Sequence, residues 1–368
     1  MKRLKVGIAG CGLVTQVEHL PNLLGLHELF EVIAIADPSA KVRNVLSARH
    51  GVRGYESALA MMDSGLDAVV VATPDAYHAD LVVAALERGL HVFCEKPLSY
   101  HAADIGRIAA ARDRAGRIVQ VGYMKRFDPA YRQLRSLLAE VTSPLRAVTV
   151  DVLDSDAAPF VAHHDLVVPD DVPAALIAEG GARKAAQVRA AIGEADPLVA
   201  RGFGGPYSSS LVHDLNLVQG LLEASSARLG RPIGAAFIAG DGGGYVSAKL
   251  EPTDGVASMT WVATPHLAYY CERISLVFDD RNFELRFPSP YLNHHPTALI
   301  ERRGRGLAFE EIHHRPSYAE PFVEELKGWH AAIVDGTAVV NSVEQAGIDM
   351  ALFAQFAKLA AQSLPPSG

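Results

Sequence analysis

The fold is decided by a glycine-rich stretch near the N-terminus, Gly7-Ile8-Ala9-Gly10-Cys11-Gly12-Leu13-Val14-Thr15. It follows an apolar run over 4–9 and leads into a helical pattern over 14–24. Gly10 allows a tight turn, and Gly12 lets the backbone approach a pyrophosphate, which the free amides at the helix start bind. The stretch therefore predicts a dinucleotide site formed by Gly10, Cys11, Gly12, Leu13 and Val14.

The surrounding residues, 1–125, alternate short apolar β-branched runs with longer amphipathic stretches, a pattern typical of β-α units around a parallel sheet. The expected strands are 4–9, 32–36, 68–71, 90–93 and 118–121. The expected helices lie near 14–24, 41–48, 56–63, 76–88 and 101–115. We therefore predict an α/β fold whose first domain, 1–125, is a doubly wound Rossmann domain.

The pattern changes after about residue 144, which predicts a second α/β domain over 126–368 with a large, mostly antiparallel open sheet. Its expected strands are 147–152, 233–239, 245–250, 256–262, 274–278 and 283–287. An insertion of about 153–206 interrupts them and contains an expected helix at 182–192. Two closing helices, 319–335 and 343–362, are expected to pack back on the domains.

The amino-acid composition limits the classes of protein to which the chain can belong. The chain has 368 residues, 49% of them apolar and 21% charged, with a formal net charge of -8. This profile excludes disordered and fibrous proteins, and the acidic balance argues against nucleic acid or an anionic membrane as a partner. Three scattered cysteines favour a reducing compartment, and neither a signal peptide nor a membrane-spanning run is apparent. We expect a cytoplasmic protein.

Asp37 ends the second expected strand, 25 residues after Gly12. A carboxylate at this position accepts hydrogen bonds from the ribose hydroxyls of an adenosine and repels a 2′-phosphate. The sequence therefore favours NAD over NADP. The alternative is that Asp37, which Pro38 and Ser39 follow, caps a helix.

The expected strand at 90–93 leads directly into Cys94-Glu95-Lys96-Pro97. This places a lysine at the carboxyl edge of a parallel sheet, where doubly wound folds bind their ligands. The alternative for Lys96 is a surface lysine before a turn.

These features occur with Ala72-Thr73-Pro74-Asp75-Ala76-Tyr77-His78 and with Gly122-Tyr123-Met124-Lys125-Arg126-Phe127-Asp128-Pro129. Together they resemble the glucose-fructose oxidoreductase, inositol dehydrogenase and MocA family. The resemblance is strong through residue 135 and weaker through His213 and 319–335, whereas 153–206 matches no known pattern.

The resemblance implies nicotinamide-dependent hydride transfer on sugars or cyclitols, by subunits that pair through the open sheet face into a homodimer or homotetramer. It places Lys96 near the reacting carbinol and the nicotinamide ribose, and Pro97 is expected to follow a cis peptide bond. Further expected contacts to the cofactor are Glu95, Thr73, Pro74 and His78. Those to the substrate are Lys96, Tyr123, Lys125, Arg126, Ser209, His213 and Asn216.

Alcohol oxidation needs a group that accepts the hydroxyl proton, and histidine is the natural base near neutral pH. His213 matches the histidine of the family's second-domain helix. Inositol dehydrogenases carry aspartates four residues before and three after it, where this chain has Ser209 and Asn216. His213 is therefore expected to be a weaker base than its relatives. A structural histidine is the alternative.

The segment 151–171 carries Asp151, Asp154, Asp156, Asp165, Asp170 and Asp171 with no lysine or arginine. An acidic segment over the site would suit an amino sugar or aminocyclitol, and a solvated loop is the alternative. Histidine pairs at 163–164, 294–295 and 313–314 lack carboxylates or cysteines at ligand spacing, so we expect no metal.

We therefore expect an NAD-dependent oxidoreductase acting on a secondary hydroxyl, or the corresponding ketone, of a sugar, amino sugar or cyclitol-like small molecule. Two alternatives stay open. An enzyme of this class can use transient oxidation for elimination or glycoside cleavage, and a dinucleotide-binding regulator would perform no catalysis.

Overall fold

The computed structural model describes residues 2–238 and 242–363, and the chain forms two compact units. The first unit consists of Met1–Tyr123, Ala162–Ala191 and Phe322–Ala351. The second consists of Met124–Val161, Ile192–Pro321 and Leu352–Gly368. Part of the expected insertion thus belongs to the first unit.

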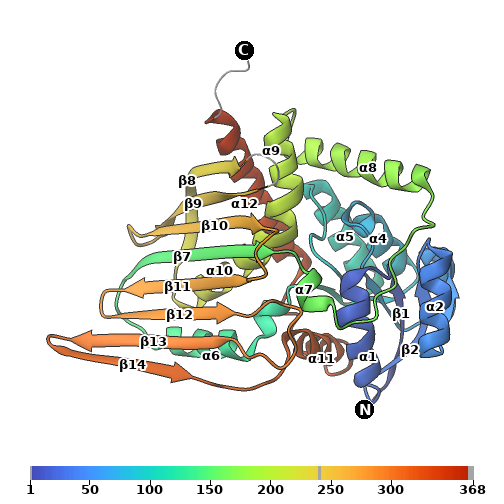
Figure 1. Ribbon diagram of the computed structural model, residues 1–368, viewed down its shortest axis with the longest axis horizontal. Coiled ribbons are helices and arrows are strands. Elements are labelled where there is room, and N and C mark those ends of the chain that lie inside the picture. The colour runs from blue at the N-terminus through green and yellow to red at the C-terminus, as the bar shows by residue number, and fades with distance from the viewer. Residues whose placement is uncertain (1, 239–241, 364–368) are drawn as a thin grey trace. The chain divides into compact units, whose positions relative to one another are not determined.

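The first unit contains a six-stranded parallel sheet, which confirms the predicted Rossmann domain (Figure 1). The central strands are continuous apolar runs because both of their faces are covered. In sheet order the strands are β3 (Arg53–Tyr55), β2 (Phe30–Ala36), β1 (Leu4–Ala9), β4 (Ala68–Val71), β5 (His91–Cys94) and β6 (Val119–Val121). All their carboxyl ends lie at one edge.

Helical segments connect these strands. Ser39 and Ser57 cap two of them by accepting hydrogen bonds from backbone amides. Left-handed Gly51 ends the helix that Ser39 caps, and left-handed Gly116 ends another. The connecting segments are η1 (Thr15–His19), α1 (Leu20–Gly25), α2 (Ala40–His50), α3 (Ala58–Met62), η2 (Asp75–Tyr77), α4 (His78–Glu87) and α5 (Ala102–Ala115). Two helices that come later in the chain, α8 (Ala174–Ile192) and α11 (Pro321–Val334), also contribute to the first unit.

An aromatic cluster fastens α11 to the sheet of the first unit. Trp329 stacks on Phe30 at 5.7 Å between ring centroids and meets the edge of Phe93 at the same distance. All three rings are fully buried. This explains the apolar spacing of the first closing helix.

The second unit contains an eight-stranded sheet whose neighbouring strands are antiparallel except for the parallel pair β7 and β10, as the predicted fold class requires. In sheet order its strands are β14 (Ala308–His314), β13 (Ala298–Arg305), β12 (Arg281–Phe287), β11 (Cys271–Phe278), β7 (Leu145–Ser155), β10 (Val256–Thr264), β9 (Gly243–Glu251) and β8 (Arg228–Ile238).

Helices pack on the second sheet, and one run of helix continues from Pro197 to Ala224 through a π-helical stretch. The helical segments are η3 (Met124–Phe127), α6 (Pro129–Leu138), α7 (Ala158–Val161), α9 (Pro197–Gly202), η4 (Phe203–Leu211), α10 (Val212–Ala224) and α12 (Val343–Gln362). The chain passes from the first unit to the second within α12. Of the helices that the structure describes, none is long and apolar enough to cross a bilayer.

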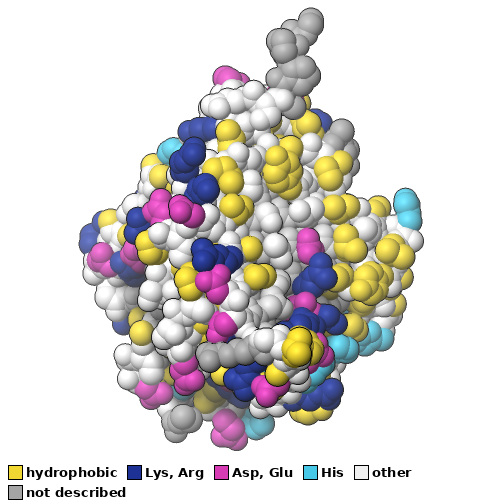
Figure 2. Space-filling view, turned by 90° about the vertical axis from the view of Figure 1, so that its left-hand side faces the viewer, with side chains coloured by type: hydrophobic (Ala, Val, Ile, Leu, Met, Phe, Trp, Pro, Cys, Tyr) yellow, Lys and Arg dark blue, Asp and Glu magenta, His cyan; other side chains and the backbone are white. Residues whose placement is uncertain are grey.

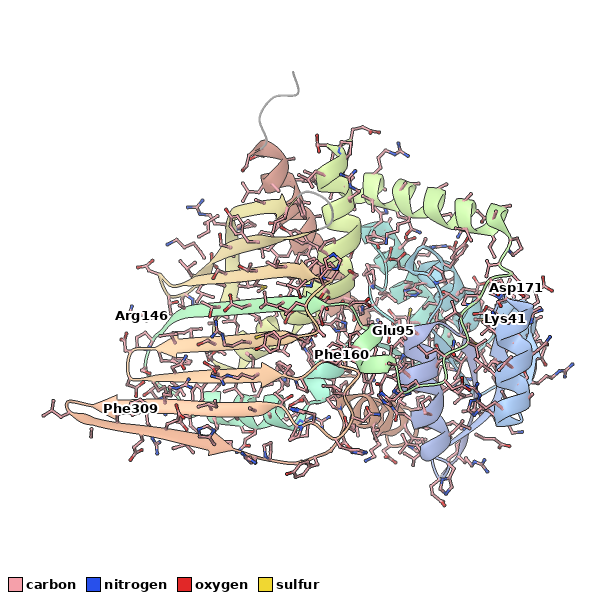
Figure 3. All side chains as sticks on the ribbon, viewed as in Figure 1. Lys41, Glu95, Arg146, Phe160, Asp171 and Phe309 are labelled. Atoms are coloured by element: carbon pink, nitrogen blue, oxygen red, sulfur yellow. The ribbon has the colours of Figure 1, made fainter. Side chains whose placement is uncertain are left out.

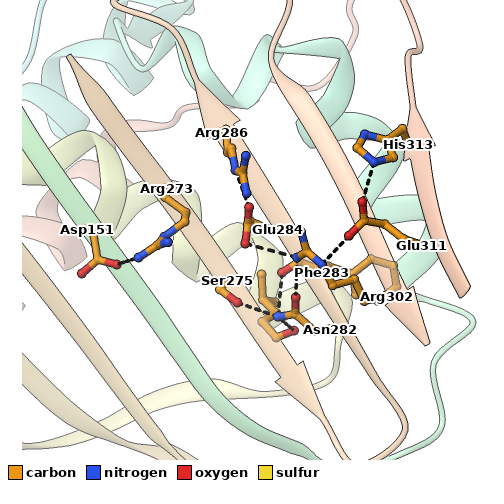
Figure 4. Close-up of polar contacts among 11 residues, drawn as sticks. Asp151, Arg273, Ser275, Asn282, Phe283, Glu284, Arg286, Arg302, Glu311 and His313 are labelled. Atoms are coloured by element: carbon orange, nitrogen blue, oxygen red, sulfur yellow. Dashed lines mark hydrogen bonds and ion pairs between the residues drawn. The ribbon is translucent and has the colours of Figure 1, made fainter. Parts of the chain in front are cut away.

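The open face of the second sheet carries a polar ladder that crosses five strands (Figure 4). Arg273 binds Asp151, while Arg302 contacts both Glu284 and Glu311. The surface seen in Figure 2 likewise mixes cationic and anionic side chains. Neither sign of charge dominates there.

The sequence-based boundaries differ from the structure in several places. Strands β3, β13 and β14 were not expected, because β3 is very short and the other two carry the charged runs of an edge hairpin. The helix expected at 182–192 begins at Ala174.

Candidate functional site

The glycine turn joins β1 to η1 at the carboxyl edge of the parallel sheet. Gly10 has a φ of +90°, and a Cβ added there would lie 2.3 Å from the carbonyl oxygen of Ala72. Thr15 stands where the common fingerprint has a third small residue, and its hydroxyl donates to the carbonyl of Gly10 at 2.7 Å. The turn is therefore tight, and only glycine fits at position 10.

Asp37 links the end of β2 to this turn. One carboxylate oxygen accepts from the amide of Cys11 and the other from the amide of Ser39, each at 2.9 Å. The N-cap of α2 is Ser39, so Asp37 does not itself cap the helix. Burial first, and then the charge of Asp37, raise the pKa of the Cys11 thiol, which stays protonated.

The loop after β4 brings Thr73, Pro74 and His78 to the same edge. His78 has one ring nitrogen 2.8 Å from the carbonyl oxygen of Thr73 and the other 2.9 Å from that of Pro97. The ring is buried. His78 thereby holds the loops that follow β4 and β5 together.

Lys96 directly follows β5, is half-buried, and precedes a cis peptide bond to Pro97, as expected. The neighbouring Glu95 is buried and lies 2.8 Å from Nε2 of His19, while its other oxygen accepts from the amide of Lys96 at 3.2 Å. Burial raises the pKa of Glu95, but the hydrogen bond and charge of His19 and the charge of Lys96 outweigh it, so the net pKa is lowered. Glu95, which Figure 3 labels, therefore remains a carboxylate bound to the backbone amide of Lys96.

Gly122 and Tyr123 follow β6 at this edge. A Cβ at Gly122 would lie 3.2 Å from the carboxyl carbon of Glu95, so the missing side chain makes room for that carboxylate. Tyr123 is buried, and its carbonyl accepts from the side-chain amide of Asn341 at 3.0 Å.

The residues at this edge fit a dinucleotide. A Cβ at Gly12 would meet nothing within 4 Å, so space is open beside the backbone there. The buried hydroxyl oxygen of Thr73 has no hydrogen-bond partner among the described residues. An open approach to a helix start and an unsatisfied hydroxyl are both suited to a phosphate-containing ligand.

The predicted substrate residues of α10 and η4 lie in the second unit. His213 is half-buried in the first turn of α10, Asn216 is fully buried one turn later, and Ser209 is exposed. Ser209 donates to the carbonyl of Gly205 at 2.7 Å. The π-helical turn that contains Ser209 shifts its register relative to α10, so these three side chains have different environments.

Lys125 belongs to a buried group of charges in the second unit. Its ammonium lies 2.7 Å from Glu272 and 3.9 Å from Asp214, and the hydroxyl of Tyr270 also donates to Glu272. Burial lowers the pKa of Lys125, but the two carboxylates outweigh it, so the net pKa is raised. Burial first, and then the charge of Glu272, raise the pKa of Asp214 well above its ordinary range. This environment therefore favours the protonated form of Asp214.

Arg126 is buried as well, and its guanidinium donates from Nε and Nη2 to the carbonyl of Asn216, at 3.1 and 2.5 Å. Both basic residues expected beside the substrate therefore have partners within the second unit.

The acidic segment makes specific contacts rather than forming one patch. Within the first unit Asp165 binds Arg49 at 2.6 Å, Asp170 binds Lys41 at 2.7 Å, and Asp171 accepts from the amide of Lys41 at 2.9 Å. Asp151 pairs with Arg273 in the second unit. These contacts weaken the expectation that the segment presents free negative charge to a cationic substrate. In the described part of the chain, no three His, Cys, Asp or Glu side chains form a metal-binding group.

Sequence reasoning missed His19 and Gln16, which lie on η1 just after the glycine turn. His19 anchors Glu95, and Gln16 exchanges two hydrogen bonds with the backbone of Val167, at 2.8 and 3.1 Å. A polar residue on the buried face of the first helix was the available signal.

The model of a family described as "Oxidoreductase family, NAD-binding Rossmann fold" matches residues 4–123. Inositol 2-dehydrogenase 1 of Saccharopolyspora erythraea is 39% identical over 139 residues, which are 37% of this chain and 41% of that protein. The rhizopine catabolism protein MocA of Rhizobium meliloti is 38% identical over 136 residues, covering 37% and 42%. The matches thus span less than half the length of these relatives.

Solved structures agree over nearly the whole chain. An aldose-aldose oxidoreductase of Caulobacter crescentus has a TM-score of 0.73 at 18% identity, covering 99% of both chains. A 3-ketoreductase of Actinomadura kijaniata, solved with NADP, has a TM-score of 0.68 at 19% identity, covering 96% of both. The structural likeness shows the fold, and the sequence over 4–123 matches the glucose-fructose oxidoreductase, inositol dehydrogenase and MocA family of oxidoreductases.

Proposed function

We propose that this protein is an NAD-dependent oxidoreductase that transfers a hydride between nicotinamide and a secondary hydroxyl, or the matching ketone, of a sugar, amino sugar or cyclitol-like substrate. The observation that carries the proposal is the position of Lys96 directly after β5, where its backbone amide binds a buried carboxylate that His19 also holds. Such a lysine stands where doubly wound folds bind their ligands.

The first unit would hold the cofactor. Amides over Gly10 to Val14 receive the pyrophosphate, Asp37 the adenosine ribose, and the loops containing Thr73, Pro74, His78 and Glu95 the nicotinamide side. NAD is favoured because Asp37 disfavours a 2′-phosphate. When bound, the nicotinamide supplies the hydride acceptor.

Lys96 and His213 are the proposed catalytic residues. The ammonium of Lys96 donates to the substrate oxygen and stabilises the negative charge that develops as the hydrogen leaves, while Glu95 holds the lysine's own backbone amide. His213 accepts the hydroxyl proton. Its half-buried position in the first turn of α10 leaves the ring partly accessible.

The remaining predicted substrate residues divide by environment. Tyr123 follows β6, and Ser209 is exposed near His213 in the sequence. Lys125, Arg126 and Asn216 are buried, so we propose that they shape the second unit around His213. Cyclitols come first among the candidate substrates because the relatives named above include an inositol 2-dehydrogenase.

Lys96→Met tests the proposal. With NAD and a panel containing myo-inositol, glucose and an aminocyclitol, wild type should form NADH, seen by its absorbance. Lys96→Met should lower turnover by about 10³-fold while changing the Kd for NADH by less than about threefold, since the lysine acts on the substrate oxygen. Lys327→Met removes an exposed lysine, whose partner is Glu324, and is the matched control with unchanged turnover.

Three results would contradict the proposal. Product without net NADH would indicate elimination or glycoside cleavage through transient oxidation. Binding of NAD without turnover on any substrate would indicate a regulator, and unchanged turnover of Lys96→Met would place the chemistry elsewhere.

We further propose that the protein forms a homodimer or homotetramer through the open face of the eight-stranded sheet. The polar ladder gives that face alternating charges that a second copy can complement (Figure 4). Light scattering should give a multiple of the 39.3 kDa chain mass, and a monomeric mass would contradict this.

A further inference from the structure

A short acidic segment, 165–171, lies along η1 and α2 of the first unit. Arg49 binds the carboxylate and the carbonyl of Asp165, at 2.6 and 2.8 Å, and Gln16 holds the backbone of Val167. The segment ends with Asp170 and Asp171 beside the first residues of α2, where Figure 3 shows Asp171 next to Lys41. It is therefore fixed at several points along the helices that follow β1 and β2.

Asp171 occupies the start of α2 with a negative charge. Its carboxylate accepts hydrogen bonds from the hydroxyl of Ser39 and from the amide of Lys41, the latter at 2.9 Å. These two hydrogen bonds lower the pKa of Asp171, so the group is ionised at neutral pH. A free amide at the start of an eleven-residue helix is where an anion binds best.

The other donors of this turn are also engaged. The ammonium of Lys41 binds Asp170 at 2.7 Å, and the guanidinium of Arg43 donates to the carbonyls of Asp37 and Pro38, at 2.6 and 2.9 Å. In Rossmann folds the carboxylate that ends the second strand marks the adenosine ribose, and basic or polar groups close to it receive a 2′-phosphate. Here those groups already have anionic or carbonyl partners from the same chain.

We propose that Asp171, assisted by Asp170, is a specificity-determining residue that excludes cofactors with a 2′-phosphate by occupying the donors which that phosphate would need. The inference rests on the proposed function, and it adds to Asp37 a second determinant that lies about 130 residues later in the chain. A phosphate entering this turn would lose the Ser39 and Lys41 donors and would meet a like charge, which is strongly unfavourable.

The test compares equilibrium binding of NADH and NADPH, by fluorescence titration, to wild type, Asp171→Asn and the double variant Asp170→Asn/Asp171→Asn. Wild type should bind NADH at least about 100-fold more tightly than NADPH. Asp171→Asn keeps the size and one acceptor oxygen but removes the charge, and should raise the affinity for NADPH about tenfold. The double variant should raise it further, and affinity for NADH should stay within about twofold because a 2′-hydroxyl carries no charge.

Two control variants separate the specific effect from general ones. Asp171→Glu keeps the charge and should retain the preference for NADH. Asp63→Asn also removes one negative charge from the first unit, but at the opposite, amino-terminal edge of the sheet, where Asp63 binds Arg88. It should leave both affinities unchanged, and thermal unfolding of each variant shows that it is folded.

Each outcome is decisive. The inference is overturned if the ratio of the two affinities is the same in wild type and both neutralised variants, or if wild type binds NADPH as tightly as NADH. If wild type binds neither dinucleotide, the proposed function itself fails and this inference fails with it. A gain for NADPH confined to the neutralised variants supports it.

Discussion

Buried carboxylates are stabilised differently in two regions of the molecule. One region is the carboxyl edge of the parallel sheet in the first unit, and the other is the group of buried charges in the second unit. At the edge, Glu95 is ionised, and it is held by His19 and by the backbone amide of Lys96. In the second unit, Lys125 is shared between Glu272 and Asp214, and burial and the charge of Glu272 favour the protonated form of Asp214.

This difference indicates that the edge serves ligand binding and that the buried group serves the stability of the second unit. The edge leaves an open approach at Gly12 and an unsatisfied hydroxyl on Thr73, which are the properties of a surface that receives a ligand. In the buried group, one cation stands between two acids, and removing it leaves charge without a partner. We therefore expect substitutions at the edge to affect cofactor binding, and substitutions in the buried group to affect stability.

The largest effect should follow from Lys125→Met. Glu272 would lose its cation at a buried position, which costs about 3–5 kcal/mol of unfolding free energy. Urea unfolding at pH 7 measures it. Lys327→Met breaks an exposed pair with Glu324 and should cost less than about 1 kcal/mol. Equal losses of unfolding free energy in the two variants would mean that the buried ion pair of Lys125 stabilises the protein no more than an exposed pair does.

A pair of glycine substitutions tests the edge. Gly10→Ala forces a side chain into a left-handed turn and against Ala72, and should destabilise the protein by about 2–3 kcal/mol. Gly12→Ala meets no atom within 4 Å and should leave stability unchanged while weakening NADH binding about tenfold or more. Thermal unfolding and NADH titration separate the two. Undiminished NADH binding by Gly12→Ala would contradict the assignment of the turn.

The smallest expected effect, counted for one pH unit, is a pH dependence of stability. The folded pKa of Asp214 is raised, so the stability from its protonated form is present below its unfolded pKa of about 4 and declines as the pH rises toward the folded pKa. Asp214→Asn should therefore gain stability relative to wild type by up to about 1.4 kcal/mol for each pH unit between 5 and 8. The contribution of Glu95 to stability depends on pH with the opposite sign, because it is lost as the pH falls through the lowered pKa of Glu95 in the folded protein.

Urea unfolding across that pH range measures the difference in stability between Asp214→Asn and wild type. The exposed Asp63→Asn is the control, and its difference from wild type should not change with pH. A constant difference for Asp214→Asn as well would show that Asp214 is ionised in the folded protein.

The two regions also differ in how far the sequence predicts them. The glycine turn directly follows β1, and Glu95-Lys96-Pro97 directly follows β5. Parallel strands bring their carboxyl ends together, so the Rossmann unit and its edge were predicted from local sequence pattern. The group of Lys125, Asp214 and Glu272 was not, because its members are far apart in the sequence and meet only through tertiary packing. The contact between Asp171 and Ser39 was not predicted either. The acidic run suggested free negative charge over the site, whereas in the structure Asp165, Asp170 and Asp171 bind residues of the first unit.

The central claim is that the amine of Lys96 meets the reactive end of a bound dinucleotide, and a crystal structure of the protein with NADH tests it most directly. The account predicts the pyrophosphate on the amides that follow Gly10, and Lys96 Nζ within hydrogen-bond reach, about 3 Å, of the nicotinamide ribose or of a substrate oxygen beside the ring. Electron density that places the nicotinamide well away from Lys96, with the ammonium in bulk water, would contradict it.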